Sequence, residues 1–96
     1  MIKSFKDKKS EDLFNGTNSK EARKIPNIFW NVVSRKMDQL NAALILEDLK
    51  APPGNRLDAL AGDLKGFHSI RVNDQYRIVF KWSPEGPELV EVTDYH

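Results

Sequence analysis

The sequence predicts an α+β fold in which N-terminal helices pack on a small antiparallel β-sheet. One observation is an amphipathic pattern over residues 26–40, where apolar side chains recur at spacings of three and four. Another is the alternation of apolar and polar residues in the C-terminal half, which follows the segment Pro52-Pro53-Gly54. This segment ends the helical half, because two prolines and a glycine cannot continue a helix. Helices first and strands second define an α+β domain, here a single domain over residues 1–96.

The N-terminal half is expected to begin with two short elements. A brief strand over residues 2–5 is followed by a helical turn over residues 10–14, which Asn15-Gly16 closes. The main amphipathic helix over residues 26–40 comes next, because Pro26 fits the first turn of a helix.

A second, shorter helix is expected over residues 42–49. Asn41 interrupts the apolar stripe of the main helix and is a good N-cap residue for a new one. The side chains expected to bury the inner face of this second helix are Leu44, Ile45, Leu46 and Leu49.

Three strands are expected in the C-terminal half. They span residues 68–73 and 76–82, and a third, defined by Leu89, Val90 and Val92, runs into Asp94-Tyr95-His96. Short polar links between consecutive strands favour an antiparallel meander. Successive side chains of a strand point to opposite faces of the sheet. The side chains predicted to pack on the helices are Ile70, Val72, Ile78 and Phe80, and those predicted to form a cationic outer face are Arg71, Arg77 and Lys81.

Arg77 lies on the middle strand, so we expect it within reach of the third strand and of Asp94-Tyr95-His96. A guanidinium binds phosphate bidentately and stays protonated in proteins. RNA cleavage without a metal needs a base for the ribose 2′-hydroxyl, a cation for the phosphorane and an acid for the 5′-oxygen. His96 can serve as acid or base, Asp94 can act as a base or orient the imidazole, and Tyr95 can stack on a nucleobase. The same residues are also typical of a solvated strand end, so both interpretations stay open on residue types alone.

Composition narrows the classes of function. The chain has no Cys and two His residues, which argues against a disulfide framework or a metal site, and no cofactor is expected. The formal net charge is +1, yet residues 1–36 hold nine Lys or Arg against four acids. Such a local excess can bind a polyanion, although a Lys-rich helix face is usually only solvated. No apolar run has the length of a membrane helix and the N-terminus lacks a signal-peptide pattern, so we expect a cytoplasmic protein without a membrane partner.

Five stretches of the chain carry a family resemblance. They are Met1-Ile2-Lys3-Ser4-Phe5, Pro52-Pro53-Gly54-Asn55-Arg56-Leu57, Ser69-Ile70-Arg71-Val72-Asn73, Tyr76-Arg77-Ile78 and Asp94-Tyr95-His96. In this order and spacing they resemble the HigB toxins of the RelE/ParE superfamily of type II toxin-antitoxin systems. The resemblance covers essentially the whole chain. It implies a compact microbial RNase-like fold and a ribosome-dependent endonuclease that cuts mRNA in the ribosomal A site.

The resemblance also implies partners and site residues. The partner would be a HigA-like helix-turn-helix antitoxin, which neutralises the toxin and links it to operator DNA. By the motif match, Arg77 would stabilise the phosphate and Asp94-Tyr95-His96 would be active-site residues, with His96 as the first candidate for proton transfer. Arg71 and Lys81 are candidate RNA-binding residues from the strand alternation rather than from the motif.

The chain departs from some HigB toxins just before the glycine turn. Those relatives carry a His and a Lys there, whereas this sequence has Asp58 and Ala61. The difference puts a two-histidine mechanism in doubt and suggests slow cleavage, with orientation by the ribosome supplying more of the rate. Arg56 is the candidate to replace the missing cation. His68 shares the parity of Ile70, so we expect it on the buried face in a structural role.

Two other functions stay open at this stage. A ParE-type toxin that poisons DNA gyrase would not need Asp94-Tyr95-His96, so truncating these residues would leave its toxicity intact. A small protein that binds only RNA or a protein partner would be harmless when expressed.

Overall fold

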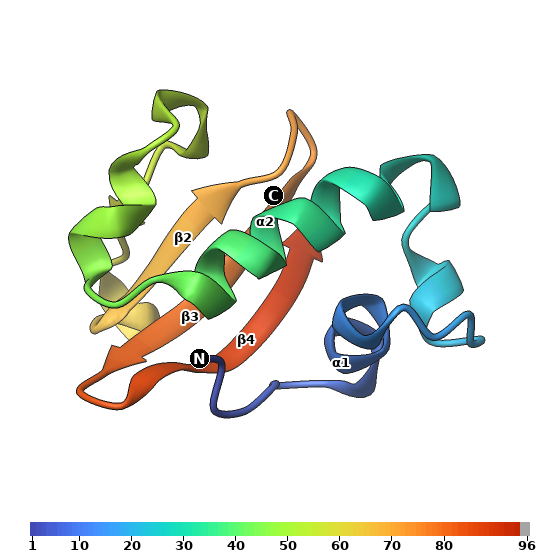
Figure 1. Ribbon diagram of the computed structural model, residues 1–96, viewed down its shortest axis with the longest axis horizontal. Coiled ribbons are helices and arrows are strands. Elements are labelled where there is room, and N and C mark those ends of the chain that lie inside the picture. Colours follow the sequence, from blue (N-terminus) through green and yellow to red (C-terminus); the bar gives the residue numbers. More distant parts are fainter. Residues whose placement is uncertain (95–96) are drawn as a thin grey trace.

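Antiparallel strands form one sheet in the computed structural model, which describes residues 1–94. Within these residues the strands are β1 (Asp58–Ala59), β2 (Phe67–Arg71), β3 (Tyr76–Ser83) and β4 (Gly86–Asp94), ordered in the sheet as in the chain. Helix α2 (Trp30–Ala42) crosses one face of the sheet in front of β3 and β4, and α1 (Lys8–Asn15) lies beside β4 (Figure 1). The predicted α+β architecture is confirmed.

Short 3₁₀ turns make up the remaining helical structure of residues 1–94. They span Ala22–Lys24, Asn27–Phe29, Leu46–Lys50, Pro53–Asn55 and Gly62–Leu64. The turn at Asn27–Phe29 runs directly into α2, so the helix predicted over residues 26–40 begins as a 3₁₀ turn and ends at Ala42. In the described part of the chain, no helix has the length and apolar character needed to cross a membrane.

The hydrophobic core lies between α2 and the sheet. Val33, Met37 and Leu40 form the buried stripe of α2 at spacings of four and three. On the sheet side, Ile78 and Phe80 of β3 are fully buried. Burial of each large apolar side chain contributes about 1.5–3 kcal/mol. Ile70 and Val72 of the neighbouring strand segment are buried in the same core, so the prediction that these four side chains pack on the helices is confirmed.

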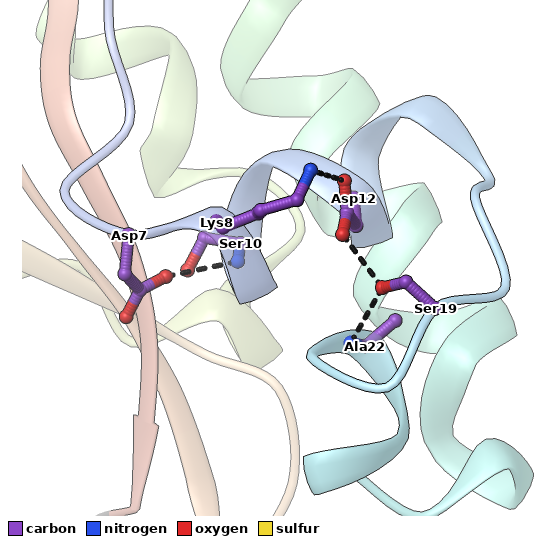
Figure 2. Close-up of polar contacts among 6 residues, drawn as sticks. All are labelled: Asp7, Lys8, Ser10, Asp12, Ser19 and Ala22. Atoms are coloured by element: carbon purple, nitrogen blue, oxygen red, sulfur yellow. Dashed lines mark hydrogen bonds and ion pairs between the residues drawn. The ribbon is translucent and has the colours of Figure 1, made fainter.

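Helix α1 is fixed at both ends and is tied to the sheet. The Asp7 carboxylate accepts a hydrogen bond of 2.9 Å from the Ser10 N–H and so caps the N-terminus (Figure 2). Gly16 ends the helix in the left-handed region, with φ 74°. The fully buried Ser10 Oγ accepts a hydrogen bond of 2.9 Å from the Val92 N–H, which joins α1 to the edge of β4.

Asp12 links α1 to the turn that follows it (Figure 2). Its carboxylate accepts hydrogen bonds from Ser19 Oγ at 2.6 Å and from Lys8 Nζ at 3.2 Å, and Ser19 Oγ accepts one from the Ala22 N–H at 3.0 Å. The hydrogen bond from Ser19 lowers the pKa of Asp12, burial opposes this effect, and Lys8 adds to the lowering.

The N-terminal segment covers the edge of β4. The Lys6 N–H donates to the Val90 carbonyl at 3.0 Å, and Phe5 forms an isolated parallel bridge with Val90. The strand predicted over residues 2–5 is thus reduced to one bridge. The Ile2 N–H donates to Asn41 Oδ1 at 2.9 Å, so Asn41 lies inside α2 and holds the N-terminal segment instead of capping a second helix.

The second helix predicted over residues 42–49 is wrong. The chain leaves α2 at Ala43 in an extended conformation, with ψ 132°, and forms only the 3₁₀ turn at Leu46–Lys50. Leu44 is 88% exposed and Ile45 is 55% exposed, whereas Leu49 is buried as expected. The apolar spacing indicated a helix, but of these three side chains only Leu49 packs in the core.

The sheet contains a strand that the sequence did not predict. The expected strands correspond to β2, β3 and β4, and β1 adds to them through the pairs Asp58 with Ser69 and Ala59 with His68. A strand of two residues is too short for alternation to be recognised.

Candidate active site

A cleft of about 490 Å³ opens on the sheet face opposite α2. The charged residues that line it are Lys6 from the N-terminal segment, Asp58 from β1, Arg77 from β3, and Glu91 and Asp94 from β4. The apolar residues of its lining are Leu60, Leu64 and Val79. The cleft therefore gathers two cations and three carboxylates from four separate segments of the chain.

The strand register aligns several of these residues in a row across the sheet. Asp58 pairs with Ser69, Ser69 with Val79, and Val79 with Glu91. Facing residues of neighbouring antiparallel strands share one face of a sheet. The row thus runs from β1 to β4 and carries a carboxylate at each end.

Arg77 lies in the neighbouring row on the same face, near the beginning of β3. Its register partners are Arg71 on β2 and Thr93 on β4. Arg77 Nη1 donates a hydrogen bond of 3.0 Å to the fully buried Ser69 Oγ. This bond orients the guanidinium in the cleft, where a phosphate group can be bound bidentately.

Arg77 also lines a smaller hollow of about 190 Å³, together with Arg56 and Arg71. Arg56 follows the Pro53–Asn55 turn in the left-handed region, with φ 46°. Arg71 forms an ion pair with Asp74. The structure thus brings three of the predicted cationic residues together beside the cleft.

Asn55 fixes the loop that carries Arg56. Its side chain is fully buried, and its Nδ2 donates to Gln39 Oε1 at 3.1 Å. Its Oδ1 accepts a hydrogen bond from Lys36 Nζ. Burial lowers the pKa of Lys36, and neighbouring positive charges, Arg71 among them, lower it further. Lys36 of α2 therefore lies close enough to Arg71 to sense its charge.

Asp94 lines the cleft without being the register partner of Arg77. Asp94 pairs with Tyr76, and Thr93 pairs with Arg77. Asp94 Oδ2 accepts a hydrogen bond of 3.3 Å from Gln75 Nε2. Asp94 has the strand parity of Val92, which faces α2, so it lines the cleft from the end of β4 and not from the outer-face position opposite Arg77.

The remaining predicted residues lie in different places. Lys81 is exposed on β3 and, within the described chain, lines neither the cleft nor the smaller hollow. His68 is half-buried and lies opposite Phe80 on the α2 side, the face predicted for it, with ring centroids 6.2 Å apart. The roles predicted for Tyr95 and His96 fall outside the described residues.

Sequence reasoning missed Lys6 and Glu91. Lys6 Nζ lies 3.6 Å from Glu91 Oε1, although the two residues are near opposite ends of the chain. Their proximity depends on the pairing of the N-terminal segment with β4, which no local pattern indicates. Asp58 was noted only as a departure from related sequences, because its place in the cleft follows from the unpredicted strand β1.

The cleft can bind an anion and transfer a proton. Arg77 supplies a fixed positive charge, and Asp58 and Asp94 supply carboxylates that can accept a proton. Among residues 1–94, no three His, Asp or Glu side chains come together as a set that could hold a metal ion.

Comparison with known proteins places this chain among toxins. The family described as "RelE-like toxin of type II toxin-antitoxin system HigB" matches residues 3–96. The chain is 46% identical over 96 residues to Toxin HigB-1 of Vibrio cholerae serotype O1 (strain ATCC 39315 / El Tor Inaba N16961), covering 100% of this chain and 98% of that protein. It is 41% identical over 59 residues to an uncharacterized protein of Haemophilus influenzae (strain ATCC 51907 / DSM 11121 / KW20 / Rd), covering 62% of this chain and 58% of that protein.

The fold and these matches define the class, a RelE-like toxin of a type II toxin-antitoxin system. Within that class the chain belongs to the HigB family, and the resemblance recognised in the sequence is confirmed. Membership of this class implies an antitoxin as its partner.

Proposed function

We propose that this toxin is a ribosome-dependent mRNA endonuclease, an mRNA interferase that cuts mRNA in the ribosomal A site and so inhibits translation. The observation that carries the proposal is the position of Arg77, which is held by Ser69 in a cleft that also contains Asp58 and Asp94. A cation with nearby proton acceptors is what cleavage by the 2′-hydroxyl requires. Membership of the HigB family supports the same reading.

In the proposed reaction the ribose 2′-oxygen attacks the adjacent phosphorus. The 2′-hydroxyl gives its proton to a base, and the bond from phosphorus to the 5′-oxygen breaks. That oxygen takes a proton from an acid, which leaves a 2′,3′-cyclic phosphate and a 5′-hydroxyl. The guanidinium of Arg77 binds the phosphate and stabilises the charge that develops on the phosphorane. No cofactor or metal ion enters this balance.

Asp58 is the proposed base and His96 the proposed acid. The carboxylate of Asp58 lines the same cleft as Arg77, and carboxylates serve as general bases. The departure from relatives with a histidine at this point would then exchange one proton acceptor for another. Asp94 orients the imidazole of His96 or shares the role of base, and Tyr95 stacks on a nucleobase.

The mRNA backbone is proposed to continue into the smaller hollow. Arg56 and Arg71 share this hollow with Arg77, so a phosphate next to the scissile one can be bound there. Lys81 lies further along β3 on the outer face and is proposed to contact the RNA outside the cleft. Orientation of the mRNA by the ribosome supplies the remaining alignment.

The proposed partners follow from this activity. A HigA-like helix-turn-helix antitoxin neutralises the toxin, and the complex contacts operator DNA through the antitoxin. The substrate is mRNA on the ribosome, so the proposed place of action is the cytoplasm.

Primer extension of cellular mRNA after brief induction tests the proposed function. We expect new 5′ ends with the unmodified toxin and none with Arg77→Ala or His96→Ala. Arg23→Ala is the matched control, since this exposed arginine donates to Asn18 far from the cleft, and it should cut like the unmodified toxin. Growth arrest without new mRNA ends would contradict the proposal, and arrest with accumulated gyrase-cleaved DNA would favour a ParE-type toxin.

A further inference from the structure

The ammonium of Lys6 lies at the rim of the cleft because the N-terminal segment is fixed to β4. The Val90 N–H donates to the Ser4 carbonyl at 3.1 Å, and the Lys6 N–H donates to the Val90 carbonyl at 3.0 Å. Lys6 is thereby placed next to Glu91, the residue that follows Val90, and both line the cleft with Arg77. Main-chain hydrogen bonds to β4 therefore fix the position of the Lys6 backbone.

The Glu91 carboxylate is the partner of Lys6, but it does not hold the lysine tightly. The distance from Lys6 Nζ to Glu91 Oε1 is 3.6 Å, and the Lys6 side chain is 55% exposed. A charge-assisted hydrogen bond is shorter, at about 2.7–2.9 Å. Exposed ion pairs also contribute little to stability. An anion that enters the cleft can therefore take the place of the carboxylate.

Arg77 enters the cleft from β3, and Lys6 enters it from the N-terminal segment at the edge of β4. Thr93 is the register partner of Arg77, and Glu91 precedes it on the same face of β4. Lys6 lies beyond this strand, on the N-terminal segment. A phosphodiester bound in the cleft can therefore lie between the guanidinium and the ammonium.

We propose that Lys6 binds a phosphodiester of single-stranded RNA in this cleft, in exchange for its pair with Glu91. The inference rests on the proposed RNA-cleaving function. In the absence of RNA the Lys6 ammonium pairs with the Glu91 carboxylate, and the RNA phosphodiester replaces that carboxylate on binding.

Single-turnover cleavage of mRNA on purified ribosomes tests this role. The toxin concentration that gives half the maximal rate (K1/2) is measured separately from the maximal rate. Lys6→Gln is expected to raise K1/2 about tenfold and to flatten its dependence on salt by about one unit of log–log slope. Lys6→Arg keeps the charge and should resemble the unmodified toxin. Lys8→Gln removes the same charge on α1, outside the cleft, and should leave K1/2 unchanged.

Glu91→Gln is expected to act with the opposite sign. Without the carboxylate Lys6 is released for RNA, so K1/2 should fall a few-fold. The matched control is Glu11→Gln, which removes one negative charge from an exposed position of α1 outside the cleft and should leave K1/2 unchanged. In a Lys6→Gln background, Glu91→Gln should lose most of its effect.

A purely structural pair predicts a different result. If the pair only fastens the N-terminal segment to β4, Lys6→Gln and Glu91→Gln weaken cleavage alike and both lower the midpoint of thermal unfolding, which would overturn the proposal. Equal K1/2 values for Lys6→Gln and Lys8→Gln would also overturn it. Should Lys6→Gln fail to fold, Glu91→Gln tests the proposal alone. A lower K1/2 supports it, and a higher K1/2 overturns it. If the unmodified toxin leaves ribosome-bound mRNA intact, the proposed function fails and this inference falls with it.

Discussion

The two faces of the sheet use the same strands for different purposes. On the α2 side, Ile78 and Phe80 of β3 are fully buried in the core. On the outer face, Arg77 and Val79 of the same strand line the cleft. Because side chains alternate along a strand, each residue serves one purpose and its neighbour the other. Changes on the α2 side should therefore affect stability, and changes on the outer face should affect activity.

The largest effect is expected from Phe80→Ala on the α2 side. The change removes a fully buried ring that stacks on His68. It should lower the free energy of unfolding by about 3–5 kcal/mol, through lost burial and the cavity left behind. Urea unfolding measures this effect. Lys81→Ala, at the next position of β3 and on the outer face, should change the free energy of unfolding by less than about 0.5 kcal/mol. Equal losses of stability for the two variants would contradict the division of roles between the two faces.

The next largest effect is expected from Arg77→Ala on the outer face. Loss of the guanidinium should lower the rate of mRNA cleavage by about 10²–10³-fold, because the phosphorane charge is no longer stabilised. Arg77→Lys should recover only part of the rate, since an ammonium cannot bind phosphate bidentately. Cleavage is measured on purified ribosomes beside the unfolding curve of each variant. A loss of rate that merely follows a loss of folded protein would count against the outer-face site.

Sequence alone predicted the division of faces but not the whole cleft. Alternation along the three longer strands identified Ile78 and Phe80 as core and Arg77 as outward, because a period of two is local information. Lys6 and Glu91 could not be found in this way, since their contact depends on the N-terminal segment covering the edge of β4. Asn41 misled the helix prediction for the same reason, because its side chain binds the Ile2 N–H across the fold.

The smallest effect is expected far from both faces, at Asp12 of α1. The hydrogen bond from Ser19 lowers the pKa of Asp12 in the folded protein, so its contribution to stability is present above the unfolded pKa of about 3.9. That contribution is lost as the pH falls through the lower, folded pKa. Thermal unfolding of Asp12→Asn and of the unmodified protein should differ by a constant amount from about pH 5 to 8 and converge in acid. A difference that grows below about pH 4 would contradict the assigned direction of the shift.

The chemistry of the cut ends tests the central claim most directly. Purified toxin is added to ribosomes that carry an mRNA with either a ribose or a 2′-deoxyribose at the cleaved nucleotide. The account predicts cleavage of the ribose substrate alone, with a 2′,3′-cyclic phosphate on one product and a 5′-hydroxyl on the other. Cleavage of the deoxy substrate, or a 5′-phosphate on the product, would contradict attack by the 2′-hydroxyl at the Arg77 cleft.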